Sequence, residues 1–225
     1  MEKKMLTLSE SEKKLLSGIT FHTEEIENGN LCDSDINLLN EMRSLAEYLP
    51  EKYPSYTFEI TGCEPKEGTI RPYNEWYYIS NQINRDSAFI ATVKNTDSEL
   101  EIKDDFYGEV IRTPIKEDIS KLLSDNGYSV IDVVVSFWKY LGKDYGENLV
   151  PKQVLSGEIQ ADNDFKIFLD ASKLNTTDYK SVAQDVAELF KQQHISGEIY
   201  LVVLRNADVD PARGRLFSQS ISLHK

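Results

Sequence analysis

Four segments that look like β-strands, joined by turn-rich loops, follow one another in the first half of the chain, with no helical segment between them. In the first of them, Tyr56, Phe58 and Ile60 alternate with polar residues. The four segments cover residues 56–60, 76–79, 87–93 and 100–103. Strands that are joined by short turns pair antiparallel, whereas parallel strands need a long crossover. This order therefore predicts an antiparallel sheet and argues against strict strand–helix alternation.

Helical patterns precede this run of strands. A capping-box pattern that begins at Thr7 predicts a short helix over residues 8–17. Asp33 or Ser34 then caps a second predicted helix, whose apolar residues share one stripe. We expect Pro50 to end this helix, because proline lacks the amide hydrogen that continues it.

The second half of the chain mixes helices and strands. Thr113 as a cap and Pro114 in the first turn predict a helix that Gly127 closes, and a fourth helix is expected over residues 178–194. Predicted strands cover residues 130–138, 154–160, 165–170, 198–204 and 216–223. The turn-forming residues 161–164 predict a hairpin between the second and third of these strands. The segment 198–204 is apolar enough for a central strand, 216–223 is expected at an edge, and the long connection before residue 198 allows one parallel pair.

These elements together predict an α+β protein with a mostly antiparallel sheet, about four helices and an N-terminal helical segment. A length of 225 residues suits one domain over 1–225. A division into 1–138 and 153–225 is the alternative, because residues 139–152 contain glycines and a proline but no clear element.

The charge balance limits the classes of partner. There are 38 acidic and 25 basic residues, for a net charge of −13. Such a chain repels phosphate backbones, so no nucleic-acid partner is expected, while a basic protein would be attracted. The longest apolar run, 199–204, is far shorter than the about 20 residues that span a bilayer. No apolar segment follows the N-terminal lysines, so we expect a cytoplasmic protein without membrane association.

Cysteine and histidine are sparse. Cys32 and Cys63 form no metal-binding pair, and free thiols are favoured over a disulfide, although pairing stays open. His22, His194 and His224 lie far apart in the sequence, and none has a metal-ligand spacing. Nucleophile and phosphate-loop motifs are absent from the sequence. The sequence therefore predicts no catalytic residue, metal site or cofactor.

Acidic residues concentrate around the fourth predicted strand. They are Asp97, Glu99, Glu101, Asp104, Asp105 and Glu109, with Lys103 among them. If Leu100 and Ile102 point inward, Glu99, Glu101 and Lys103 share the opposite face. Three interpretations are open: a solvated hairpin whose charges protect a sheet edge, a surface for a basic partner, or a carboxylate-based catalytic or metal site.

Aromatic residues concentrate on the second predicted strand. Tyr73, Trp76, Tyr77 and Tyr78 follow Arg71 closely. Successive strand residues face opposite ways, so Tyr77 cannot share a face with Trp76 and Tyr78. Tyrosine, tryptophan and arginine dominate protein interfaces, which suggests a contact surface. The alternative is that both faces of the sheet are covered and all four rings belong to the core.

Part of this pattern resembles small uncharacterised α+β proteins of Gram-positive bacteria. The resemblance covers about residues 48–138 and rests on Tyr56-x-Phe-Glu-Ile60, an aromatic strand, the segment 89–93, and Asp104-Asp-Phe-Tyr-Gly108 before a helix. It implies a bacterial, cytosolic origin. It implies no activity and no functional residues.

The favoured hypothesis is a non-enzymatic, acidic protein-binding module, such as an inhibitor of the immunity-protein type that acts on a basic partner. The residues expected to contact that partner are Glu99, Glu101, Asp104, Asp105, Glu109, Tyr73, Trp76 and Tyr77. The alternative is a carboxylate-based enzyme, metal-assisted or not, with its site at Asp104, Asp105 and Glu109. An accessory role or a homo-oligomer is a third reading, because the sequence does not indicate the oligomeric state.

Overall fold

The computed structural model describes residues 4–83, 86–96, 99–137, 142 and 144–223. Contacts divide the chain into two compact units, 1–106 and 107–225, and each unit has its own sheet and core. Residues 139–141 and 143 of the predicted loop at 139–152 lie outside the described residues, and the strands on either side of it in the sequence pair with each other in the second unit. A single domain over 1–225 stays a prediction. Among the described residues, no helix combines the length and apolar content that crossing a bilayer requires.

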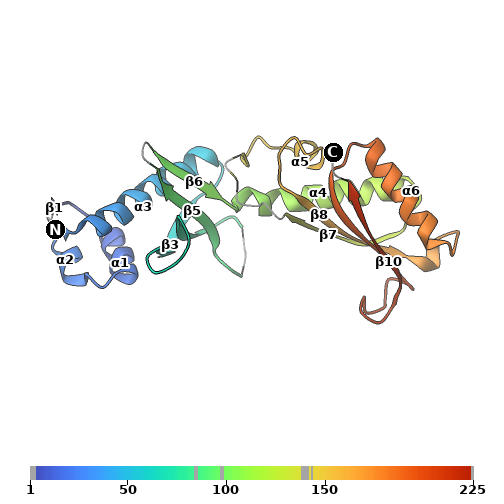
Figure 1. The fold of residues 1–225 in the computed structure, drawn as a ribbon, viewed down its shortest axis with the longest axis horizontal. Helices are drawn as coiled ribbons and strands as arrows, with labels where there is room; N and C mark the ends of the chain where they lie inside the picture. The colour runs from blue at the N-terminus through green and yellow to red at the C-terminus, as the bar shows by residue number, and fades with distance from the viewer. Residues whose placement is uncertain (1–3, 84–85, 97–98, 138–141, 143, 224–225) are drawn as a thin grey trace. The chain divides into compact units, whose positions relative to one another are not determined.

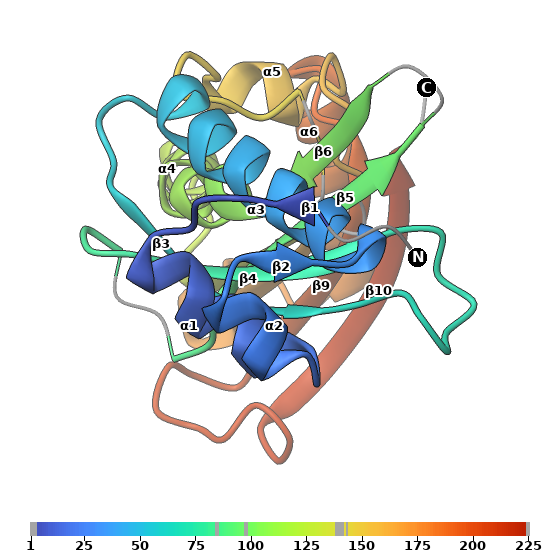
Figure 2. The same cartoon turned by 90° about the vertical axis from the view of Figure 1, so that its left-hand side faces the viewer.

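The first unit begins with a small helical subdomain (Figure 2). Its elements are β1 (Lys4–Met5), α1 (Glu10–Ile19), α2 (Thr23–Glu27), β2 (Asn30–Leu31) and α3 (Asp33–Lys52), and β1 pairs antiparallel with β2. The capping box is formed by Ser9 and Glu12 rather than by Thr7 and Glu10, so α1 starts and ends two residues later than predicted. Gly18 lies within the helix, because α1 extends to Ile19.

The prediction that Pro50 ends the second helix was wrong. Pro50 lies inside α3, which continues to Lys52, and the amide of Tyr53 still donates to the carbonyl of Leu49 at 2.9 Å. A proline inside a helix loses its own amide hydrogen bond and crowds the carbonyl four residues earlier. Leu45, Leu49 and Tyr53 are all fully buried, so packing of the last turn offsets that loss.

A four-stranded antiparallel sheet completes the first unit (Figure 1). Its strands are β3 (Phe58–Glu64), β4 (Asn74–Ser80), β5 (Phe89–Asn95) and β6 (Leu100–Asp104), paired in sequence order. The predicted run of four antiparallel strands is thus confirmed. Helix α3 packs on one face of the sheet, where Trp76, Tyr78 and Phe89 are buried. On the opposite face Tyr77 and Ile79 keep some exposure.

The second unit packs helices against a sheet of mixed direction. Its elements are α4 (Phe106–Asp125), whose first residue still belongs to the first unit, β7 (Val130–Phe137), α5 (Pro151–Leu155), β8 (Asn163–Asp170), the short 3₁₀ helix η1 (Ala171–Lys173), α6 (Tyr179–Gln192), β9 (Gly197–Leu204) and β10 (Arg215–Leu223). The strand order is β10-β9-β8-β7, and only β8 and β9 pair parallel. The central position of β9, the edge position of β10 and the parallel pair are as predicted. Trp138, predicted as the end of β7, and His224 lie outside the described residues.

Two predicted boundaries in the second unit were wrong. Helix α4 starts at Phe106, so Pro114 is interior and Thr113 is no cap. The buried Ile111 extends the apolar face upstream of the proline, and its packing helps to offset the proline's cost of about 3 kcal/mol. Residues 154–160 form no strand, because Pro151 starts helix α5 and a turn follows it. The hairpin predicted at 161–164 is therefore absent, and β8 pairs with β7 instead.

The class prediction is confirmed. Among the described residues, four helices have seven or more residues, the sheets are mostly antiparallel, and helices make up most of the N-terminal segment before β3. The end of α6 is set by His194, which takes a left-handed φ of 57°. The amides of His194 and Ile195 donate back to Lys191 and Phe190, as in a Schellman motif. Gly197 has another role: a Cβ there would lie 2.5 Å from the carbonyl oxygen of Asn163.

Candidate functional site

The acidity of the chain is concentrated in the first unit. Residues 1–106 contain 21 acidic and 11 basic residues, for a net charge of −10. Residues 107–225 contain 17 acidic and 14 basic residues, for a net charge of −3. A field of this size attracts basic molecules and accelerates their encounter with the surface. The first unit is therefore the part of the chain that a basic partner would approach.

The aromatic strand β4 divides its rings between two faces, as its alternation predicts. Trp76 is fully buried, and its indole N–H donates to Glu41 of α3 at 3.0 Å. Tyr78 is buried on the same side, whereas Tyr73 and Tyr77 are half-buried. Trp76 therefore belongs to the core and offers no contact surface in this conformation.

Tyr77 lies beside a large groove in the first unit. The groove has a volume of about 730 Å³ and is lined by residues of α1, α3 and β3 together with Tyr77. The hydroxyl of Tyr77 donates to Glu64 at 3.1 Å, and Arg71 pairs with the same carboxylate at 3.2 Å. An anchored aromatic ring beside a groove of this size is typical of a place where a partner's side chain inserts.

The edge strand β6 carries the exposed part of the acidic cluster. Glu99 is exposed immediately before the strand, where its amide donates to the Thr96 hydroxyl and its carbonyl accepts from the Thr96 amide. Glu101 is half-buried, forms an ion pair with Lys103 at 2.8 Å, and lies opposite Lys94 of β5. Charges along an edge strand also discourage the edge of another sheet from pairing with it. Asp97 lies outside the described residues.

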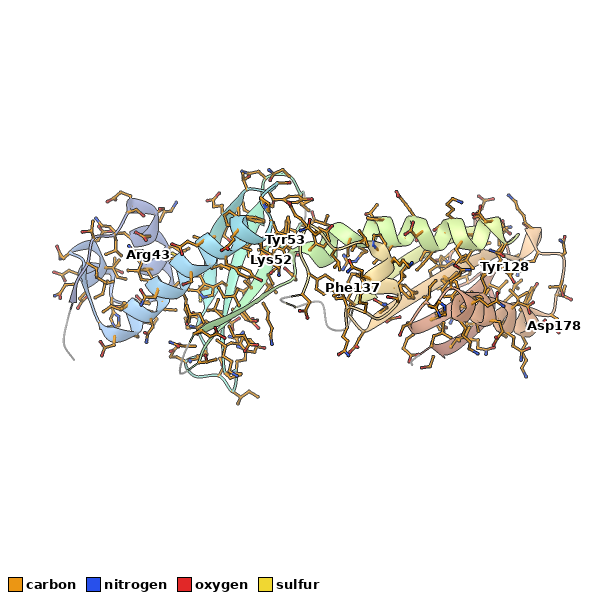
Figure 3. The ribbon with its side chains drawn as sticks, turned by 90° about the horizontal axis from the view of Figure 1, so that it is seen from above. Arg43, Lys52, Tyr53, Tyr128, Phe137 and Asp178 are labelled. Carbon is orange, nitrogen blue, oxygen red and sulfur yellow. The ribbon has the colours of Figure 1, made fainter. Side chains whose placement is uncertain are left out.

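Asp104 is an interior residue with a complete set of hydrogen bonds. Its carboxylate accepts from the hydroxyls of Tyr48 and Tyr53 at 2.8 and 2.7 Å, from Lys52 at 2.7 Å, and from the amide of Phe106 at 3.1 Å. Lys52 and Tyr53 lie at the C-terminal end of α3 (Figure 3). Burial, and then the charge of Asp104, raise the pKa of both tyrosines. This network joins α3 to the end of β6.

The other two predicted carboxylates also make internal contacts. Asp105 is 4% exposed, and its side chain accepts from the amide of Ile90 at 2.9 Å. Glu109 is half-buried on α4 in the second unit, where it accepts from Arg112. Asp104 and Asp105 therefore tie elements of the first unit together, whereas Glu99 is exposed and Glu101, Tyr73 and Tyr77 are half-buried.

Glu41 is a buried carboxyl that the sequence analysis does not single out. Asn74 and Trp76 donate to the same oxygen, Oε2, at 2.8 and 3.0 Å. Burial raises the pKa of Glu41, and these two hydrogen bonds only partly offset it. The folded state thus holds this proton more tightly than the unfolded state does.

This raised pKa makes Glu41→Gln a test of pH dependence. The wild type loses stability as the pH rises above 4.5 toward the folded pKa, because the charged form is disfavoured inside the protein. Glutamine keeps an acceptor for Asn74 and Trp76 without the charge. Urea unfolding from pH 4 to 7 should therefore show that the free energy of unfolding of the variant increases relative to that of the wild type as the pH rises. Glu41→Leu is the contrast: it leaves both donors unpaired and should be less stable at every pH.

The structure brings together three residues that the sequence analysis leaves apart: His22, Cys32 and Asp35. Nδ1 of His22 lies 2.9 Å from Oδ1 and 3.2 Å from Oδ2 of Asp35. The thiol of Cys32 donates to Oδ2 of Asp35 at 3.0 Å and lies 3.7 Å from Nδ1 of His22. Burial opposes ionisation of Asp35, but the hydrogen bonds from Cys32 and His22 outweigh it and lower its pKa. Cys32 and Cys63 are both free.

Comparisons with known proteins assign no family to the chain. No protein-family model matches it, and no curated protein is similar to it in sequence. A solved structure that does match is that of a DUF5037 family protein from Ruminococcus gnavus ATCC 29149. The two chains are 13% identical, the match covers 80% of this chain and 91% of that one, and the TM-score is 0.40. A likeness at this level carries no argument about function.

Proposed function

We propose that this chain is a non-enzymatic protein-binding module whose first unit binds a basic protein, in the manner of an inhibitor of the immunity-protein type. The supporting observation is that Tyr77 lines a groove of about 730 Å³ on the unit that carries a net charge of −10. Charge of one sign steers an oppositely charged partner, and an aromatic side chain at a groove supplies contact area.

The contact residues in this proposal are the members of the predicted set in the first unit that keep some exposure. Glu99 and Glu101 on the edge strand supply charge, and Tyr73 and Tyr77 supply aromatic contact. Asp104, Asp105 and Trp76 act indirectly, because their internal hydrogen bonds fix the strands that present the contact residues. A carboxylate-based enzyme gains no support at Asp104, since four donors already bind its two oxygens.

Charge reversal at the edge strand tests this proposal. We expect Glu99→Lys combined with Glu101→Lys to slow association with the partner by about tenfold or more at low salt, with a smaller effect on dissociation. The matched control is Glu117→Lys with Asp118→Lys, which makes the same charge change at exposed positions of α4 in the second unit. The rates would be measured by surface plasmon resonance with the protein that the chain captures. Equal slowing by both double variants would contradict the proposed location.

A further inference from the structure

We propose that His22, Cys32 and Asp35 form a binding site for a divalent metal ion of the zinc type. His22 lies in the turn before α2, Cys32 immediately precedes α3, and Asp35 lies in the first turn of α3. Each offers one ligand atom, and these three atoms lie within 4.8 Å of one another. The inference does not depend on the proposed protein-binding function, because it rests on different residues.

The spacing of the three ligand atoms suits a tetrahedral ion. With bond lengths of about 2.0 Å to nitrogen and oxygen and about 2.3 Å to sulfur, such an ion holds nitrogen and oxygen about 3.3 Å apart and sulfur about 3.5 Å from each. The observed distances are 3.2 Å from His22 Nδ1 to Asp35 Oδ2 and 3.7 Å from that nitrogen to Cys32 Sγ. The distance from Cys32 Sγ to Asp35 Oδ2 is 3.0 Å, so this is the one distance of the three that has to increase appreciably when an ion binds.

The chemistry of the three groups also matches zinc. Imidazole, thiolate and carboxylate are its protein ligands, and one thiolate with one carboxylate neutralises a divalent charge. The thiol of Cys32 donates to Oδ2 of Asp35 and Nδ1 of His22 lies within hydrogen-bond distance of the same carboxylate, so all three groups already face one point that an ion would occupy. The hydroxyl of Ser34 lies 3.1 Å from Cys32 Sγ, where it can donate to the thiolate and stabilise it.

The local fold holds the site in place. Next to the β1–β2 pair, the amide of Leu6 donates a hydrogen bond to the carbonyl of Gly29 at 2.9 Å. The chain is so close here that a Cβ at Gly29 would lie 2.5 Å from the carbonyl oxygen of Leu6. Ile26 and Leu31 are fully buried on either side of this turn. Cys32 and Asp35 are 9% and 0% exposed, so two ligands are fixed inside the protein before an ion arrives.

The third ligand leaves the site open on one side. The His22 side chain is 46% exposed, so an ion has an entry path and its fourth position can hold water. Three protein ligands with one water is the coordination of open zinc sites, whereas closed structural sites use four protein ligands. The inferred site is therefore an open one.

Cobalt(II) titration tests this inference, because a cobalt–thiolate bond gives a charge-transfer absorption band in the near ultraviolet. We expect the full-length protein to develop this band with one cobalt per chain and zinc to abolish it by competition. The Cys32→Ser variant should lack the band, and serine is a favoured residue at the start of a helix, so the variant should still fold. The matched control is Cys63→Ser, which should keep the band. Burial raises the pKa of the Cys63 thiol, which disfavours a thiolate there.

Graded variants then separate coordination from nonspecific binding. In the competition experiment, His22→Ala and Asp35→Asn should each bind zinc at least about 100-fold more weakly than the wild type. Even the loss of a residue that only hydrogen-bonds to a metal ligand lowers metal affinity by about 10–100-fold. Ser34→Ala should weaken zinc by about tenfold. The inference is overturned if wild-type protein gives no charge-transfer band, if Cys32→Ser keeps it, or if Cys63→Ser loses it.

Discussion

Replacing Asp104 by alanine is expected to lower the free energy of unfolding of the first unit by about 3–5 kcal/mol. The change leaves the Lys52 ammonium group, 12% exposed, without the carboxylate that neutralises it. It also removes the acceptor of the Tyr48 and Tyr53 hydroxyls. Amide hydrogen exchange in α3, β4 and β5 would measure the loss within the first unit itself.

The contrast for this variant is an exposed ion pair in the same unit. Glu10 pairs with Lys13 at 3.0 Å, and the Glu10 side chain is 89% exposed. Solvent screens such a pair, so Glu10→Ala should change hydrogen exchange of the same amides very little. A loss in Asp104→Ala no larger than that in Glu10→Ala would show that the Asp104 network does not hold α3 to β6.

Phe106→Ala is the second variant with a large expected effect, about 3–5 kcal/mol of unfolding free energy. The Phe106 ring lies at the centre of an aromatic cluster in the first unit. Its centroid lies 4.8–5.0 Å from those of Tyr53, Tyr56, Phe58 and Phe89. Alanine would leave a cavity among rings that other elements hold in place. Urea unfolding combined with hydrogen exchange in β3–β5 would measure the loss.

Phe21→Ala provides the matched control for Phe106→Ala. Phe21 is fully exposed, so the same change of residue type removes no buried contact, and we expect a change of about 0.5 kcal/mol or less. Similar losses from the two variants would contradict the role of the Phe106 cluster as the core of the first unit.

The order of elements was predictable because local patterns carry it. Alternation in β4 correctly separates Tyr77 from Trp76 and Tyr78, and the apolar segment of β9 correctly indicates a central strand. Helix boundaries were less predictable where two signals competed. Thr7-x-x-Glu10 and Ser9-x-x-Glu12 are both capping-box patterns. The helix starts at the second of them, and Leu16 in its C-terminal half is fully buried. Pro50 and Pro114 show tertiary packing overriding a local stop signal.

The candidate sites were less predictable, because their chemistry depends on contacts distant in sequence. Acidic runs are usually solvated, yet Asp104 is fully buried because Lys52, 52 residues earlier, neutralises it. His22 has no histidine or cysteine partner at a ligand spacing in its own segment, and the chain reversal through α2 brings Cys32 to it. One local signal was present: Cys32 and Asp35 are three residues apart at the start of a predicted helix, a spacing that places side chains on one face.

Capture of a partner by the tagged full-length chain tests the central claim most directly, because the claim is that the acidic first unit binds a basic protein. The capture would use an extract of the native host at low and at moderate salt, with mass spectrometry to identify what binds. The proposal predicts one stoichiometric basic protein that is lost as salt rises, that Glu99→Lys with Glu101→Lys fails to capture, and that the α4 double variant still captures. The proposal would be contradicted if no stoichiometric partner were captured at either salt concentration. It would also be contradicted if the captured partner were retained at moderate salt and by the variant with Glu99→Lys and Glu101→Lys.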